Sequence, residues 1–253
     1  MNIIVAIKVV ADDQDIQVAA DGSLDMSKAK PVVSAYDLNA IEAAAKLAEA
    51  NEGSKVCAIT VGPSSIDDSK LKKNILARGV DELFMVADDS ASDLDSYATA
   101  EVLAAEIAKV GEYDLVLCGD GSADNYAQQV DVQLACRLDV PSVNGAVSIE
   151  PAGSSFTVTR RLEDVSEVVE VSAPCVIAVT PEIALPRIPG MRDILKAGKK
   201  PMNVEPAASP CENVTEVVEV KAPKQAARKL EVKNASDDGA IEWFSAALKS
   251  ALR

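Results

Sequence analysis

The most informative segment of the chain reads Leu117-Cys118-Gly119-Asp120-Gly121-Ser122-Ala123-Asp124-Asn125-Tyr126-Ala127-Gln128-Gln129-Val130. An apolar strand, Asp114 to Cys118, ends here in a glycine-rich turn that leads into a predicted helix, Ala123 to Leu138. Gly119 and Gly121 allow the tight or positive-φ geometry that such a turn needs. Turns of this kind lie at the carboxyl edge of a parallel sheet, where α/β proteins hold nucleotides.

Two interpretations of this turn remain open from spacing alone. A helix that opens near Ser122 to Asp124 offers unpaired N–H groups to a phosphate, while Ser122 or Asp124 could equally serve only as its N-cap. The turn is not a Walker loop, because no Gly-Lys-Ser/Thr follows it. It is not a GxGxxG fingerprint either, because Asp124 occupies the third glycine position.

The first 140 residues alternate short apolar runs with helical patterns, which is typical of βαβ units and a parallel sheet. After Pro141 the pattern changes to short strands separated by turn residues, some of them antiparallel. The predicted fold class is therefore α/β: a mostly parallel, doubly wound sheet with helices on both faces, plus an antiparallel extension and a C-terminal arm. The expected strands are 3–10, 55–61, 81–86, 114–118, 143–149, 156–161, 167–171 and 176–180, and the expected helices are 35–50, 64–78, 93–110 and 123–138.

The chain is predicted to divide near residue 200. Residues 1–200 form a nucleotide-binding domain that includes an irregular loop, 184–200, with Ile188 and Met191 among its prolines. Residues 201–253 form an extended arm that ends in an amphipathic helix. One face of this helix carries Ile241, Phe244, Ala247, Leu248 and Ala251.

Composition excludes several classes of function. The formal net charge of −15 argues against binding to nucleic acid or to an anionic membrane surface. The sequence has no histidine, which removes Ser-His-Asp and Cys-His catalysis and His-ligated metal sites. The five cysteines show no CxxC spacing, as expected for a reducing compartment. No leader and no membrane-inserted segment is evident, so we expect a cytoplasmic protein.

Several segments together resemble the β subunit of electron transfer flavoproteins, within its Fix-type branch. The turn at 119–122 and the run Tyr126-Ala127-Gln128-Gln129-Val130 are part of this resemblance, as is Val140-Pro141-Ser142-Val143-Asn144-Gly145. The most specific run is Val158-Thr159-Arg160-Arg161-Leu162-Glu163-Asp164 followed by Glu167. The chain departs from the pattern at Val165, where an acidic residue or glycine is expected.

The resemblance implies an electron-carrying heterodimer and no complete active site in this chain alone. FAD would be shared with the α subunit, and the β-subunit pocket would hold AMP or, in relatives that bifurcate electrons from NADH, a second FAD. The Fix-type resemblance favours the second FAD. The residues that would line this pocket are Ala6, Val61, Gly119, Asp120, Gly121, Ser122, Asp124, Gln128, Gln129 and Val130.

The resemblance also identifies the loop 184–200 as a recognition loop. Through it the β subunit would bind a partner dehydrogenase or quinone oxidoreductase, with Met191 as the apolar anchor and Ile188 next to it. The arm and terminal helix would dock on the α subunit. Two other functions stay open: a stand-alone ATP-dependent enzyme of a related fold, and an adenine-nucleotide sensor.

Overall fold

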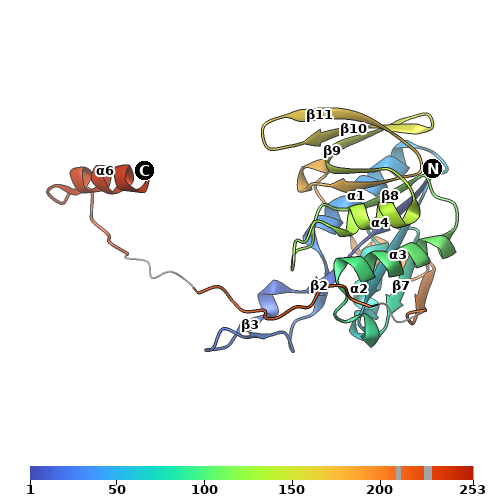
Figure 1. Ribbon diagram of the computed structural model, residues 1–253, viewed down its shortest axis with the longest axis horizontal. Coiled ribbons are helices and arrows are strands. Elements are labelled where there is room, and N and C mark those ends of the chain that lie inside the picture. Colours follow the sequence, from blue (N-terminus) through green and yellow to red (C-terminus); the bar gives the residue numbers. More distant parts are fainter. Residues whose placement is uncertain (209–211, 225–229, 253) are drawn as a thin grey trace.

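The centre of the molecule is a nine-stranded sheet with the order β11-β10-β9-β12-β8-β1-β6-β7-β13 (Figure 1). The structure is a computed structural model that describes residues 1–208, 212–224 and 230–252. The strands from β9 to β13 in this order are parallel, and β9, β10 and β11 form an antiparallel extension at one side. This arrangement confirms the predicted fold class.

The sheet strands have the following bounds: β1 Asn2–Ala6, β6 Lys55–Gly62, β7 Glu82–Ala87, β8 Leu115–Gly119, β9 Ser142–Ala152, β10 Ser155–Arg161, β11 Ser166–Ser172, β12 Cys175–Val179 and β13 Met202–Glu205. Two short ribbons lie beside the sheet, β2 Val9–Ala11 with β5 Pro31–Val33, and β3 Gln17–Val18 with β4 Leu24–Asp25. The helices are α1 Ala35–Ala50, α2 Ser69–Leu76, α3 Ser96–Val110, α4 Val130–Leu138, α5 Met191–Ala197 and α6 Ala240–Ala251.

Helices cover both faces of the sheet because successive side chains of a strand point to opposite sides. Ile3 and Val5 of β1 pack into one core with α1, α2 and α5. Ile4 and Ala6 of the same strand pack into a second core with α3 and α4. A strand that is buried on both faces reads as a continuous apolar run, which is how β1 appears in the sequence.

Four expected elements differ from the structure. The helix expected at 64–78 is confined to Ser69–Leu76, because Ser64–Ile66 form a separate 3-10 helix and Asp68 caps α2. The apolar run 3–10 forms two strands, because the chain leaves the sheet after Ala6 and Val9 pairs with Val33 in the small β2-β5 ribbon. The helix expected from Ala123 begins at Val130, and residues 120–129 form a loop. Part of the segment after residue 200, expected to be extended over a surface, adds β13 to the sheet edge beside β7.

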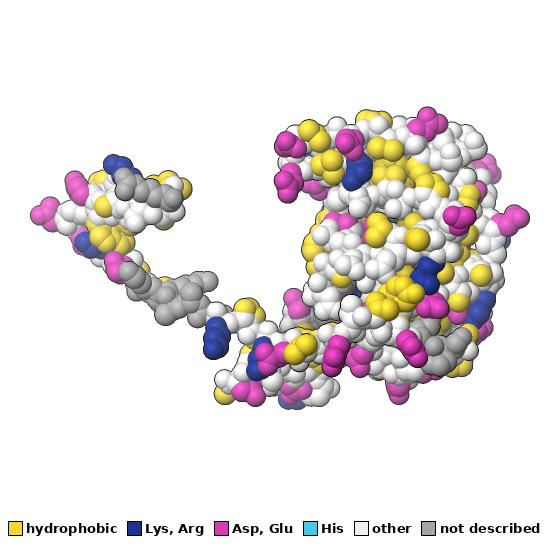
Figure 2. Space-filling view, in the orientation of Figure 1, with side chains coloured by type: hydrophobic (Ala, Val, Ile, Leu, Met, Phe, Trp, Pro, Cys, Tyr) yellow, Lys and Arg dark blue, Asp and Glu magenta, His cyan; other side chains and the backbone are white. Residues whose placement is uncertain are grey.

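The last helix lies apart from the sheet domain, at the end of a long connecting segment (Figure 1). In Figure 2 apolar side chains are visible on this helix, and Ile241, Phe244 and Leu248 are all exposed. Among the described residues, none of the helices is long and apolar enough to cross a membrane.

Candidate functional site

The candidate site lies at the point where the chain stops adding strands on one side of β1 and begins to add them on the other side. From β1 the chain proceeds through α1 to β6 on one side, whereas β8 lies on the other side of β1 and leads through β9 to β12. In open α/β sheets, ligands bind outside the carboxyl ends of the strands at such a switch point. Ala6 ends β1 and Gly119 ends β8, so these two predicted site residues are located at this point.

A buried carboxylate joins the two strand ends. Asp37 of α1 accepts the N–H of Lys8 at 2.8 Å through Oδ2 and the N–H of Gly119 at 2.9 Å through Oδ1. Its side chain is only 4% exposed, and burial raises its pKa to about 7 against the lowering effect of the two N–H donors. Asp37 therefore fixes the backbone on both sides of the switch point.

The loop 120–129 is held over this edge by Lys8 and by α1. The Lys8 ammonium pairs with Asp124 Oδ2 at 2.6 Å, and the Ser122 hydroxyl donates to Asp124 Oδ1. The Ala123 N–H donates to the hydroxyl of buried Ser34 at 3.2 Å. Burial opposes ionisation of Asp124, but hydrogen bonds from Lys8 and Ser122 outweigh it and lower the pKa. Asp124 is thus an ionised carboxylate whose charge is compensated by Lys8. The sequence analysis did not single out Lys8 as a site residue.

Tyr126 folds back onto Gly121. A Cβ atom on Gly121 would lie 2.3 Å from Cδ2 of the Tyr126 ring, so only glycine leaves room for this contact. The Tyr126 hydroxyl donates to Asp120 Oδ2 at 3.0 Å, and its ring centroid is 5.1 Å from that of Tyr36. Tyr126 has φ 46° and Gln128 has φ 53°, values that non-glycine residues rarely adopt. The loop is therefore strained at the position of the candidate site, which is where folds commonly store strain.

Asp120 presents a second carboxylate under the loop. Its Oδ1 atom is buried and has no hydrogen-bond partner within the described parts of the chain. Burial raises the pKa of Asp120, and burial also raises the pKa of Asp131 of α4, with Asp120 contributing to that second shift. An unsatisfied buried acceptor of this kind is costly, and a ligand hydroxyl or amine would relieve the cost.

The start of α4 brings Gln129 and Val130 to the site. Gln129 Oε1 accepts from the hydroxyl of Ser96 and from Nε2 of Gln133, both at 3.0 Å. Ser96 opens α3, so the first turns of α3 and α4 meet at this cluster. The anion-binding helix start expected near Ser122 to Asp124 is wrong, because the left-handed residues 126 and 128 delay the helix to Val130. The N-terminus of the helix accordingly lies at Val130, where the Asp131 carboxylate accepts from the N–H groups of Asp131 and Val132.

The remaining predicted residues lie on the α3–α4 side of the same edge. Ala6 is buried and Val61 is half-buried, and both pack against the core beneath α3 and α4. Gln128 is exposed in the loop. The structure thus brings the predicted pocket residues to one edge of the sheet. Lys8, Asp37, Ser96 and Gln133 join them, and the sequence analysis singled out none of these four residues.

The recognition loop, residues 184–200, lies on the opposite helix layer, over α1 and α2. Ile188 and Met191 are 93% and 77% exposed, and Leu195 of α5 is 67% exposed on the same loop. We call Ile188, Met191 and Leu195 the apolar row. The sequence analysis did not single out Leu195, which lies in α5.

The arm contacts the sheet domain before it reaches α6. Asp95, the N-cap of α3, accepts the N–H groups of Val214 at 2.7 Å and Thr215 at 2.9 Å. Asn213 Oδ1 accepts the N–H of Asp95 at 2.9 Å, and the Ala222 N–H donates to the Gly22 carbonyl at 2.9 Å. The arm is therefore attached to Asp95, which directly precedes Ser96 of the polar cluster in the candidate site.

Comparison with known families identifies a match. The family model of the electron transfer flavoprotein domain matches residues 22–210. The matched residues include the loop 120–129, helix α4, the β10–β11 hairpin and the recognition loop.

Proposed function

The chain belongs to the electron transfer flavoprotein family, and from this premise we propose that it is the β subunit of a heterodimeric carrier, of the Fix-type branch. The proposal assigns an adenine nucleotide to the switch-point site and a redox partner to the recognition loop. The observation that carries it is the loop 120–129, held over the carboxyl ends of β1 and β8 by Asp37, Lys8 and Ser34.

The donors and acceptors at the site fit an adenine nucleotide. The N–H groups at the start of α4 suit phosphate oxygens. The amide of exposed Gln128 suits ribose or phosphate oxygens, and the orphaned Asp120 Oδ1 suits a ribose hydroxyl or an amine. Because Lys8 neutralises Asp124, this carboxylate repels a phosphate less than a free one would.

Two nucleotides match these donors, AMP and the AMP half of a second FAD. The resemblance to the Fix-type branch favours FAD. A second FAD would supply redox chemistry that splits the electron pair of NADH, whereas AMP would supply none. In either case this chain's residues bind and orient AMP or the AMP half of the second FAD. The FAD shared with the α subunit remains a separate group.

The recognition loop supports docking of a partner dehydrogenase or quinone oxidoreductase. Ile188, Met191 and Leu195 form an exposed apolar row, and Arg192, Lys196 and Lys199 are exposed beside it. Flexible Met side chains suit contacts with more than one partner. On a chain of net charge −15, this basic border favours a partner whose apolar pocket has acidic edges.

The arm supports assembly with the α subunit. Residues 213–215 are attached to Asp95, while α6 exposes Ile241, Phe244 and Leu248. An amphipathic helix with an uncovered apolar face is the usual element for docking in a groove of another chain. We assign that groove to the α subunit.

Calorimetric titration of the full-length chain with AMP and with ATP tests the nucleotide site. We expect saturable binding of AMP that is weakened in Gly121→Ala, and no turnover of ATP. Hydrolysis of ATP by the isolated chain would support the stand-alone enzyme instead. Binding of AMP without formation of a flavin-containing complex with the α subunit would support the nucleotide sensor.

A further inference from the structure

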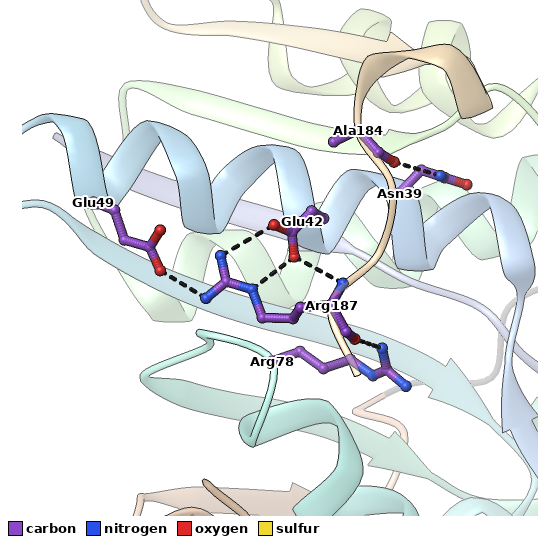
Figure 3. A network of polar contacts seen from close by, with 6 residues as sticks. All are labelled: Asn39, Glu42, Glu49, Arg78, Ala184 and Arg187. Carbon is purple, nitrogen blue, oxygen red and sulfur yellow. Dashed lines mark hydrogen bonds and ion pairs between the residues drawn. The ribbon is translucent and has the colours of Figure 1, made fainter. Parts of the chain in front are cut away.

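The recognition loop is attached to α1 before it reaches its exposed part. Asn39 Nδ2 donates to the Ala184 carbonyl at 2.7 Å (Figure 3). It also donates to the Pro181 carbonyl at 3.2 Å. Asn39 is buried, so the contact with Ala184 is shielded from water, whereas the contact with Pro181 is part-buried. The entry to the loop therefore has a fixed path along α1.

Three residues further on, Arg187 is held by Glu42. The Arg187 Nε donates to Glu42 Oε2 at 2.6 Å and its NH2 group donates to Oε1 at 3.2 Å, while the Arg187 backbone N–H also reaches Oε2 at 3.1 Å (Figure 3). Glu42 is 5% exposed. Such paired, charge-assisted bonds fix direction as well as distance. The backbone and side chain of one loop residue are thus bound to a single buried carboxylate.

Two further hydrogen bonds hold Arg187. Its NH1 group donates to Glu49 Oε1 at 2.6 Å, and its carbonyl accepts from NH1 of Arg78 at 2.6 Å. The hydrogen bonds that Arg187 donates to Glu42 and Glu49 raise the pKa of Arg187, so these bonds stabilise its charged form. A Cβ atom on Gly79 would lie 2.7 Å from Cβ of Ala45 and 3.4 Å from Arg187 NH1. Gly79, with φ 97°, therefore allows the close approach of the α2–β7 turn to α1 beside Arg187.

The exit of the loop is also fixed. The Lys200 ammonium donates to the carbonyls of Leu76 and Val80, on the same turn after α2. Ala197 is fully buried and Ile194 packs against the main core, so one side of α5 is anchored. The opposite side carries the exposed apolar row. Both ends and one face of the loop are therefore held, while the apolar row, Leu185 and the basic side chains beside the row are exposed and can contact another molecule.

We propose that Glu42 is a positioning residue for the recognition loop: acting through Arg187, it holds the apolar row in its docking conformation before a partner binds. The inference rests on the proposed docking function of loop 184–200. A loop ordered in advance loses less conformational entropy on association, so binding is tighter for the same contacts. Glu42 contacts neither a partner nor a cofactor in this account, and its effect is transmitted through Arg187.

Hydrogen exchange on the full-length chain tests the positioning directly. Glu42→Gln removes the charge and one of the acceptors, and we expect amide exchange over residues 184–197 to become about tenfold faster or more. Glu49→Gln is the matched control, because Glu49 holds the same arginine but its side chain is 62% exposed, and we expect a change below about twofold there. Unchanged exchange over 184–197 in Glu42→Gln would overturn the proposal.

A second variant covers the case in which Glu42→Gln does not fold. Removing one partner of a buried ion pair leaves the other charge uncompensated, which can be strongly destabilising. The double variant Glu42→Gln/Arg187→Gln leaves no such charge. We expect it to fold and still to show faster exchange over 184–197; protection equal to that of the wild-type chain would contradict the role of Glu42.

Kinetics of the heterodimer separate positioning from a general structural effect. With a purified flavin dehydrogenase that reduces the wild-type heterodimer, Glu42→Gln should raise the KM for the heterodimer about tenfold while kcat stays within about twofold. An unchanged KM would overturn the positioning role. The variant Met191→Ser tests the docking function itself: if it leaves KM unchanged, the proposed docking fails, and the exchange data still decide whether Glu42 orders the loop.

Discussion

The Asp37 side chain accepts the backbone N–H of Gly119 at 2.9 Å, although the two residues are 82 positions apart in the chain. Its other oxygen accepts the N–H of Lys8. This one carboxyl group therefore ties α1 to the ends of both central strands, at the point where the glycine-rich loop begins. The site is organised by a residue that does not itself belong to the loop.

Asp37→Asn should change how stability depends on pH. The pKa of Asp37 is raised from 3.8 to about 7 in the folded state. The stability that the protonated Asp37 contributes is therefore fully present below pH 3.8 and is lost as the pH rises to about 7. In the wild-type chain, titration of Asp37 lowers the free energy of unfolding by up to about 1.4 kcal/mol per pH unit in that window. Urea unfolding of both proteins measures how the free energy of unfolding of each depends on pH. The range from pH 4 to 7 follows from the two pKa values of Asp37.

The variant should be less stable than the wild type at the acid end of this window, and its stability should depend less on pH across the window. An amide offers one acceptor oxygen where the carboxyl offers two, so one of the N–H groups of Lys8 and Gly119 loses its partner, at a cost of about 1–3 kcal/mol. If the pH slopes of the two proteins are identical, Asp37 does not titrate as described.

Gly121→Ala should weaken nucleotide binding with little effect on stability. The new Cβ would lie 2.3 Å from the Tyr126 ring, which must move and take the loop with it. We expect the Kd for AMP to rise about tenfold or more, a loss of about 1.4 kcal/mol. Titration calorimetry measures the Kd, and Gly198→Ala is the control, because a Cβ there meets no atom closer than 3.6 Å. Equal affinities of the two variants would argue against a nucleotide at this loop.

Met191→Ser should weaken docking of the redox partner without slowing electron transfer once docked. Central apolar anchors of an interface commonly contribute about 2 kcal/mol or more, so we expect the KM to rise at least about tenfold. Val168→Ser is the matched control, because Val168 is 70% exposed on β11, away from the recognition loop. An equal effect of both substitutions would remove the special role of Met191.

Truncation after Gly239 should weaken assembly with the α subunit. This deletion removes α6, whose apolar face is exposed in this chain, so we expect the Tm of the isolated chain to change by less than about 2 °C. The Kd of the heterodimer should rise at least about tenfold. Sedimentation or calorimetry measures it, and an unchanged Kd would mean that the helix docks elsewhere.

Local patterns predicted most of the fold, because most elements depend on local periodicity and turn chemistry. Helix α1 was expected at 35–50 and has those bounds, since an alanine-rich amphipathic run follows Ser34 without Gly or Pro. The run 3–10 was mispredicted as one strand. Its apolar pattern continues past Ala6, but the Lys8 N–H bonds to the Asp37 side chain instead of to a neighbouring strand, so a tertiary partner ends the strand.

The candidate site was only partly predictable for the same reason. The loop itself is visible in the sequence because glycines follow an apolar strand. The residues that hold it are not: Lys8 is 116 positions from Asp124, and Ser34 is 89 positions from Ala123. The start of α4 was mispredicted because Ser122 and Asp124 resemble capping residues, whereas here they bond to each other and Asp124 pairs with Lys8.

The most direct test of the central claim is the nucleotide content of this chain copurified with its α subunit, measured by absorption and by analysis of the released nucleotides. The account predicts a second adenine nucleotide beside the shared FAD, namely FAD or AMP, and predicts that Gly121→Ala loses this second nucleotide alone. A complex that holds a single FAD and no further nucleotide would contradict the assignment of the loop 120–129 as a nucleotide site.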